Sequence, residues 1–136
     1  MRRPKPAVEL SILALGILLG STSANAKQWV CSNQAAEISC GKTGCNVAEG
    51  FTPMSVGLDT KGKMSVCAYS GCWEGKASKI VKTGSYTTFY SNRLKWSQNE
   101  GTGPSYIDAS VTIDRRQSYA TMLAAGYAHP MTCKLN

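Results

Sequence analysis

The stretch YIDASVTID (residues 106–114) decides the fold class, because apolar and polar side chains alternate along it without a break. One face of the extended chain is apolar and carries Ile107, Ala109, Val111 and Ile113. The other face carries Tyr106, Asp108, Ser110 and Thr112. A period of two over nine residues predicts a β-strand with one buried and one solvated face.

The same alternation recurs along much of the chain. MSVGL (54–58) and KMSVCAY (63–69) flank DTKG, a hairpin loop in which Gly62 can adopt positive φ. Ser91-Asn92 is a further turn signal. We predict about eight short strands, with the tail as a ninth, at Lys27–Ser32, Ser55–Leu58, Lys63–Tyr69, Trp73–Val81, Ser85–Tyr90, Arg93–Ser97, Tyr106–Ile113, Ser118–Ala124 and Met131–Leu135. Such spacing predicts an all-β fold, a single small antiparallel barrel or sandwich.

Two segments leave the choice between strand and helix open. SNQAAEIS (32–39) fits a helical turn that Ser32 or Asn33 would cap. SYATMLAAG (118–126) fits either a strand or a helix that stops at Gly126, and its alternation favours the strand. The tail strand should begin only after the break at Gly126 and Pro130.

The first 26 residues have the pattern of a cleavable signal peptide. A basic start precedes an apolar run from Leu10 to Leu19, and Ala24-Asn25-Ala26 fits a cleavage site before Lys27. The apolar run is shorter than the roughly 20 residues that span a bilayer. We therefore expect one exported domain, residues 27–136, that is periplasmic or secreted and has no transmembrane segment after cleavage.

The net charge is positive even without this leader. Removing Arg2, Arg3, Lys5 and Glu9 lowers the formal charge from +7 to +5. A basic exported domain favours an anionic envelope polymer, or a host or bacterial protein, as its partner, and nucleic acid is not expected outside the cytoplasm. Solubility alone is the plainer explanation of the charge.

Six cysteines, all beyond the leader, predict disulfides in an oxidising compartment. CGKTGC (40–45) and CAYSGC (67–72) are the size of hairpin turns, so each could close on itself. Cys31 and Cys133 would then join the first strand to the last. The alternative pairs Cys31 with Cys40 and sends Cys45 to Cys67, Cys72 or Cys133. The spacing of the cysteines does not exclude a four-thiolate zinc site, but an oxidising compartment argues against it because oxidised thiols cannot bind zinc.

Residues for catalysis are scarce, so we expect no enzyme and no cofactor. His129 is the only histidine, and we expect a surface or loop-packing role for it. Glu74 follows Trp73 and is a weak candidate for an acid with a raised pKa; a solvated strand position is the simpler reading. We name no catalytic, cofactor-binding or metal-binding residue.

Aromatic and basic side chains are interleaved in the middle of the chain. Such groups can bind sugars or anionic polymers, although tryptophans also fill cores and lysines protect edge strands. The tryptophans are Trp29, Trp73 and Trp96, and the cations are Lys76, Lys79, Lys82, Arg93 and Lys95. One turn-rich loop is a candidate binding loop: Gln98, Asn99, Glu100, Gly101, Thr102, Gly103, Pro104 and Ser105.

The leader, a cysteine near each mature end, the strand meander and WSQNEGTG (96–103) together resemble small exported Cys-rich β-domains of bacteria, including the periplasmic inhibitors of C-type lysozyme. That resemblance implies a surface loop that blocks a hydrolase. The family's S-G-x-x-Y element is inverted and respaced here as GSYTTFY (84–90), so no functional residue is carried over. We expect a non-enzymatic binding or structural domain of the cell envelope or secretome, with hydrolase inhibition as the alternative.

Overall fold

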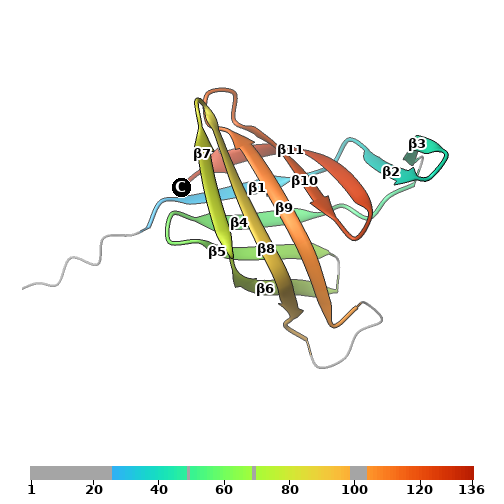
Figure 1. Ribbon diagram of the computed structural model, residues 1–136, viewed down its shortest axis with the longest axis horizontal. Coiled ribbons are helices and arrows are strands. Elements are labelled where there is room, and N and C mark those ends of the chain that lie inside the picture. The colour runs from blue at the N-terminus through green and yellow to red at the C-terminus, as the bar shows by residue number, and fades with distance from the viewer. Residues whose placement is uncertain (1–25, 49, 69, 99–103) are drawn as a thin grey trace, which may run out of the picture.

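The computed structural model describes residues 26–48, 50–68, 70–98 and 104–136, and these residues form strands and turns without a helix. Eight antiparallel strands close a barrel in the order β1-β4-β5-β6-β8-β9-β10-β11, and β11 pairs again with β1 (Figure 1). The strands are β1 (Gln28–Ser32), β4 (Ser55–Asp59), β5 (Lys63–Ala68), β6 (Gly71–Lys76), β8 (Tyr86–Trp96), β9 (Tyr106–Asp114), β10 (Tyr119–Ala124) and β11 (Tyr127–Leu135).

Three further strands extend this barrel. β7 (Lys79–Thr83) pairs only with the first half of β8. β2 (Glu37–Gly41) and β3 (Gly44–Ala48) form a hairpin that projects from the barrel and joins it through the start of β11 (Figure 1). In the described part of the chain, no helix has the length and apolar character needed to cross a membrane.

The three disulfides follow the scheme in which each short element closes on itself. Cys67 lies directly opposite Cys72, and Cys40 lies directly opposite Cys45, each pair flanking a tight turn. Cys31 of β1 is bonded to Cys133 of β11 across the pairing that closes the barrel. No cysteine in the described residues is free, so no thiolate is left for a zinc site.

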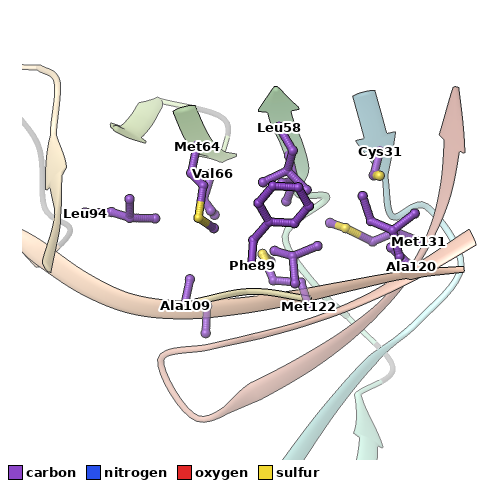
Figure 2. Close-up of a cluster of buried hydrophobic side chains, with 14 of the residues drawn as sticks. Cys31, Leu58, Met64, Val66, Phe89, Leu94, Ala109, Ala120, Met122 and Met131 are labelled. Carbon is purple, nitrogen blue, oxygen red and sulfur yellow. The ribbon is translucent and has the colours of Figure 1, made fainter. Parts of the chain in front are cut away.

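Alternating inward-facing side chains fill the barrel with an apolar core. Figure 2 shows Phe89, Leu58 and Met122 reaching inward from different walls of the barrel. The buried apolar residues are Cys31, Val56, Leu58, Met64, Val66, Trp73, Phe89, Leu94, Ile107, Ala109, Val111, Ile113, Ala120, Met122, Ala124, Met131 and Cys133. Trp29 and Trp96 are partly buried and pack against this cluster.

The predicted strand Trp73–Val81 is wrong, because the chain breaks at Ala77-Ser78 and changes its neighbour. The amide of Ala77 donates to Gly62 O (2.7 Å), and that of Ser78 donates to Tyr90 O (2.7 Å). The chain thus leaves β5. It pairs with the end of β8 before the break, as β6, and with the first half of β8 after it, as β7. Local alternation continues through both strands and contains no sign of this exchange of partners.

The turn predicted at Ser91-Asn92 is also wrong, because β8 runs through it with a bulge between Ser91 and Leu94. Arg93 has a φ of 65°, and its amide donates to Asp108 Oδ1 (2.8 Å). A bulge and a turn share polar residues and unusual backbone angles, so the sequence signal does not separate them.

β11 begins at Tyr127 and passes through Pro130, earlier than predicted. One edge of β11 pairs with β10. The other edge pairs with β2 at Tyr127–Ala128 and with β1 from Thr132 onward, so Pro130 lies in the gap between these two partners. A proline is tolerated there because the ladder on that edge is interrupted anyway.

Both helical alternatives are resolved in favour of strands. SYATMLAAG contains β10, which ends in a tight turn at Ala125 (φ 51°) and Gly126 (φ 87°). Asn33 does accept hydrogen bonds, from the amides of Ala35 and Ala36, but the turn it caps leads into β2. The capping signal was correct, and the element that follows it was not.

Candidate functional site

The two ends of the barrel differ in chemistry, and one of them is the strongest candidate site. The β4–β5 and β9–β10 turns lie at this end, together with Lys27, which precedes β1, and the end of β11. They surround a cavity of about 580 Å³, which we call the mouth. It is lined by Lys27, Trp29, Thr60, Ile80, Lys82, Thr87, Phe89, Arg115 and Leu135.

Two cross-strand pairs (rungs) between β7 and β8, which are separated by the Val81–Thr88 pair and share one face, set the polarity of the mouth. Lys82 lies opposite Thr87, and Ile80 lies opposite Phe89. The polar rung is nearer the start of β8 and the apolar rung is deeper in the barrel, where Phe89 is 4% exposed. Across the cavity, Trp29 pairs with Leu135 and supplies a second apolar wall.

The charge that lines the mouth is of one sign. Lys27, Lys82 and Arg115 carry it, and no acidic residue is among the described lining residues. Within the described chain the only contact of ion-pair length joins His129 to Glu37 at the other end of the barrel, and it is an ion pair only when the imidazole is protonated. The lysine charges at the mouth therefore have no carboxylate partner there, and they attract anions.

Arg115 also has a structural role. Its Nε donates to Ser85 O (3.1 Å), its Nη2 donates to Gly84 O, and its amide donates to Ser85 O (3.0 Å). These bonds tie the β9–β10 turn to the β7–β8 turn. A guanidinium has five N–H groups, so donors remain for a ligand.

Asp114, the carboxylate next to Arg115 in sequence, is occupied by its own turn. The amide of Arg116 donates to its Oδ1 (2.8 Å), and that of Gln117 does so at 3.3 Å. Chiefly the Arg116 hydrogen bond lowers the pKa of Asp114 below its ordinary value, against the opposing effect of burial. Its charge stabilises the turn and is absent from the lining of the mouth.

The opposite end contains His129, which the sequence analysis wrongly expected at the surface or in a loop. It is 3% exposed and points inward from β11, because the alternation that buries Met131 and Cys133 buries it too. Asn33 Nδ2 lies 3.3 Å from its Nδ1 and 2.6 Å from Ala36 O. Since an amide nitrogen only donates, Nδ1 of the neutral ring accepts.

Burial lowers the pKa of His129, and the nearby Glu37 carboxylate opposes that shift. The distance from Nδ1 to Glu37 Oε2 is 3.7 Å. The imidazole is thus held between a turn and the projecting hairpin, with no serine or cysteine nucleophile among its described hydrogen-bond partners. This arrangement links the imidazole of β11 to the Asn33 turn and to β2.

The predicted binding loop falls largely outside the described residues, since Asn99, Glu100, Gly101, Thr102 and Gly103 are not among them. Its two flanks are held in place. Trp73 Nε1 donates to Pro104 O (2.7 Å), and the amide of Trp96 donates to Ser105 O (2.9 Å). The rings of Trp73 and Trp96 lie 4.5 Å apart beneath them.

Other residues singled out in the sequence are dispersed. Trp73 faces the core, whereas Glu74 is exposed and lies opposite Lys95, so the indole does not bury the carboxyl. Of the predicted basic cluster only Lys82 lines the mouth, and Lys79 lies on the outward face of β7. No group of His, Cys, Asp and Glu among the described residues could hold a metal ion.

Sequence reasoning missed most of the mouth, because its residues come from six separate segments. Two signals were present. Alternation in KIVKT (79–83) puts Ile80 and Lys82 on one face, and alternation in YTTFY (86–90) puts Thr87 beside Phe89. A face that mixes a cation or hydroxyl with a large apolar side chain is unusual for both core and surface.

Comparison with known proteins returns no relative: no protein-family model, no curated protein and no solved structure matches this chain.

Proposed function

We propose that this protein is an exported, non-enzymatic binding protein that holds an anionic ligand in the mouth, with an apolar part of the ligand against the mouth's inner wall. One observation carries the proposal: two lysines, which have no carboxylate partner among the described residues, and an arginine line the same cavity as the apolar side chains of Trp29, Ile80, Phe89 and Leu135. A cavity of about 580 Å³ is within the range that small-molecule sites occupy.

Export is part of the proposal. Three disulfides are typical of proteins that fold in an oxidising compartment. Together with the signal-peptide pattern of residues 1–26, they support a periplasmic or secreted location. An anionic component of the cell envelope, or of the surrounding medium, is the class of ligand that such a protein would meet.

The direct test compares ligands that share one tail and differ in head-group charge. Octyl phosphate, octyltrimethylammonium and octyl glucoside are titrated into the mature protein by calorimetry, below their micelle-forming concentrations. We expect binding of the phosphate, weaker binding as salt is added, and no binding of the cation. Equal affinity for the three, or no binding of the phosphate, contradicts the proposal.

A matched pair of variants locates the binding. Lys82→Gln should weaken octyl phosphate binding about tenfold, because a hydrogen bond to a charged group is lost along with the charge. Lys79→Gln removes the same charge from the outward face of the same strand, so its affinity should equal that of the wild type. Equal losses in both variants would mean a general charge effect.

An anionic polymer is one of the two classes of partner expected from the sequence, beside a host or bacterial protein, and it can be tested at the same site. A linear polyphosphate that binds in the mouth should compete with octyl phosphate and should be weakened by Lys82→Gln. Polyphosphate binding without competition would assign polymer recognition to another surface.

Hydrolase inhibition is a second candidate function, favoured by the anchoring of both flanks of the loop Gln98–Ser105. A loop whose ends are held by Trp73 and Trp96 is suited to insertion into a partner's cleft. The test is inhibition of a C-type lysozyme by the wild type and by a variant with a short turn in place of the loop. Inhibition that survives the replacement contradicts this function.

A further inference from the structure

Thr87 is a polar group in the mouth wall that the barrel itself leaves without a partner. The residue is 5% exposed, and its Oγ1 is buried without a hydrogen-bond partner in the described structure. Buried hydroxyls in native proteins are nearly always hydrogen-bonded, because an unpaired one destabilises the fold. An exception that lines a ligand-sized cavity requires an explanation.

The hydroxyl groups of Thr88 and Ser91, on the same strand, have hydrogen-bond partners. Thr88 Oγ1 lies 3.0 Å from Thr112 Oγ1, and Ser91 Oγ donates to Lys76 O (2.9 Å). The other unpartnered buried group in the described chain is Trp96 Nε1, which lies at the opposite end of β8. Among the hydroxyls of β8 that are not exposed, only that of Thr87 lacks a partner in the described structure.

The Thr87 side chain can present its oxygen to the mouth at little cost. A change to another staggered χ1 rotamer can bring Oγ1 to the position that Cγ2 occupies, while Cγ2 moves to the position of the Cβ hydrogen. Because Oγ1 makes no hydrogen bond in the unliganded barrel, the rotation breaks none. Lys82 is the cross-strand neighbour of Thr87, so both donors would face the same group on a ligand.

The depth of the mouth limits the rest of the ligand. Below the Lys82–Thr87 rung lie Ile80 and Phe89, and below Phe89 the barrel is filled by core side chains (Figure 2). An apolar tail therefore has Trp29, Ile80 and Leu135 to lie against, but no channel along the barrel axis.

We infer that the mouth recognises an oxyanion, a phosphate or a carboxylate, that bears a short apolar group, and that Thr87 is the residue that determines specificity by donating its hydroxyl hydrogen bond to that oxyanion beside Lys82. This inference rests on the proposed function and adds the head group, the tail length and the residue. The hydroxyl is kept at a cost to the empty barrel because the ligand uses it.

Thr87→Val and Thr87→Ser test this residue. Valine has the shape of threonine without the hydroxyl, so the empty protein should unfold at the same or a higher urea concentration, while octyl phosphate binds about tenfold more weakly. Serine restores the hydroxyl and should bind within about twofold of the wild type.

The outcomes separate the two proposals. If the wild type does not bind octyl phosphate, the proposed function fails and this inference fails with it. If the wild type binds and Lys82→Gln weakens binding, but Thr87→Val binds as tightly as the wild type, the mouth is retained and the role of Thr87 is overturned. Loss of binding in Thr87→Ser as well would show that the methyl group, and not the hydroxyl, matters.

A series of alkyl phosphates from butyl to dodecyl tests the tail. Affinity should rise over the first methylene groups and then level off once the wall of the mouth is covered. A steady gain up to dodecyl phosphate, about fourfold in affinity per methylene, would instead indicate a deep channel and overturn the short-tail assignment. Octanoate compared with octyl phosphate identifies which oxyanion is preferred.

Discussion

The two ends of this barrel are built by the same strands, but the polar side chains at the two ends differ in their hydrogen-bond and charge partners. At the end that contains His129, the imidazole has Asn33 and Glu37 as partners, and Trp73 Nε1 is bonded to Pro104 O. At the mouth, Lys82 has no carboxylate partner and Thr87 Oγ1 has no hydrogen bond among the described residues. The opposite end has one unpartnered buried atom of its own, Trp96 Nε1, but the unpaired hydroxyl of Thr87 is the one that lies beside unpaired cations in a ligand-sized cavity among the described residues.

The largest expected effect comes from the Cys31–Cys133 disulfide, which joins β1 to β11 where the barrel closes. The Cys31–Cys133 bond closes 102 residues of sequence separation, and chain entropy assigns about 4–5 kcal/mol to such a loop. Changing both residues to alanine should lower the free energy of unfolding by that amount, measured by urea denaturation, and should weaken octyl phosphate binding.

The Cys40–Cys45 bond is the matched control for that prediction. It closes a separation of five residues in the β2–β3 hairpin and is worth about 2 kcal/mol in the same model. Its double alanine variant should lose less stability and keep the affinity of the mouth. If both double variants lost the same stability and the same octyl phosphate affinity, the mouth would not be independent of the β2–β3 hairpin.

A smaller effect is expected from Gly71→Ala at the end opposite the mouth. A Cβ there would lie 2.6 Å from Gln98 Cγ and 2.9 Å from the Trp96 ring. Overpacking of this kind costs about 1–3 kcal/mol in the free energy of unfolding. Gly41→Ala is the control, since no atom lies within 4 Å of its added Cβ. Unchanged stability in Gly71→Ala would mean that the Trp96 indole moves freely.

The smallest effect concerns pH. The pKa of His129 is lowered in the fold, so below about pH 6.5 the unfolded chain binds a proton that the folded chain does not. Stability should be complete above that pH and should fall as the pH drops from 6.5 toward the folded pKa. The effect is small because Glu37 opposes the shift.

His129→Gln provides the comparison for this pH dependence. Glutamine does not titrate, so the slope of unfolding free energy against pH between 7 and 5 should become flatter than in the wild type. The mouth contains no histidine in its lining, so at each pH the octyl phosphate affinity of His129→Gln should equal that of the wild type. An unchanged slope in His129→Gln would remove the histidine from the explanation.

The sequence predicted the parts of the fold that depend on neighbouring residues. Alternation located β9 and β10, and the DTKG turn was correct in detail: Asp59 Oδ1 accepts from the amides of Lys61 and Lys63 (2.8 Å each), and Gly62 has a φ of 88°. Errors arose where a strand changed its neighbour, as at Ala77-Ser78. Partner choice depends on residues far away in sequence, so a local pattern contains no record of it.

By itself, the sequence determined that the chain is all-β, where most strands lie and that its short cysteine elements are the size of closed turns. Period-two alternation and hairpin chemistry are local, and they act wherever the segment is placed. Only the tertiary structure decided that β1 meets β11, that His129 is buried, and that Lys27, Lys82, Thr87 and Arg115 surround one cavity. A barrel closes through contacts between its first and last strands, so the chemistry at its ends exists only once the chain has folded.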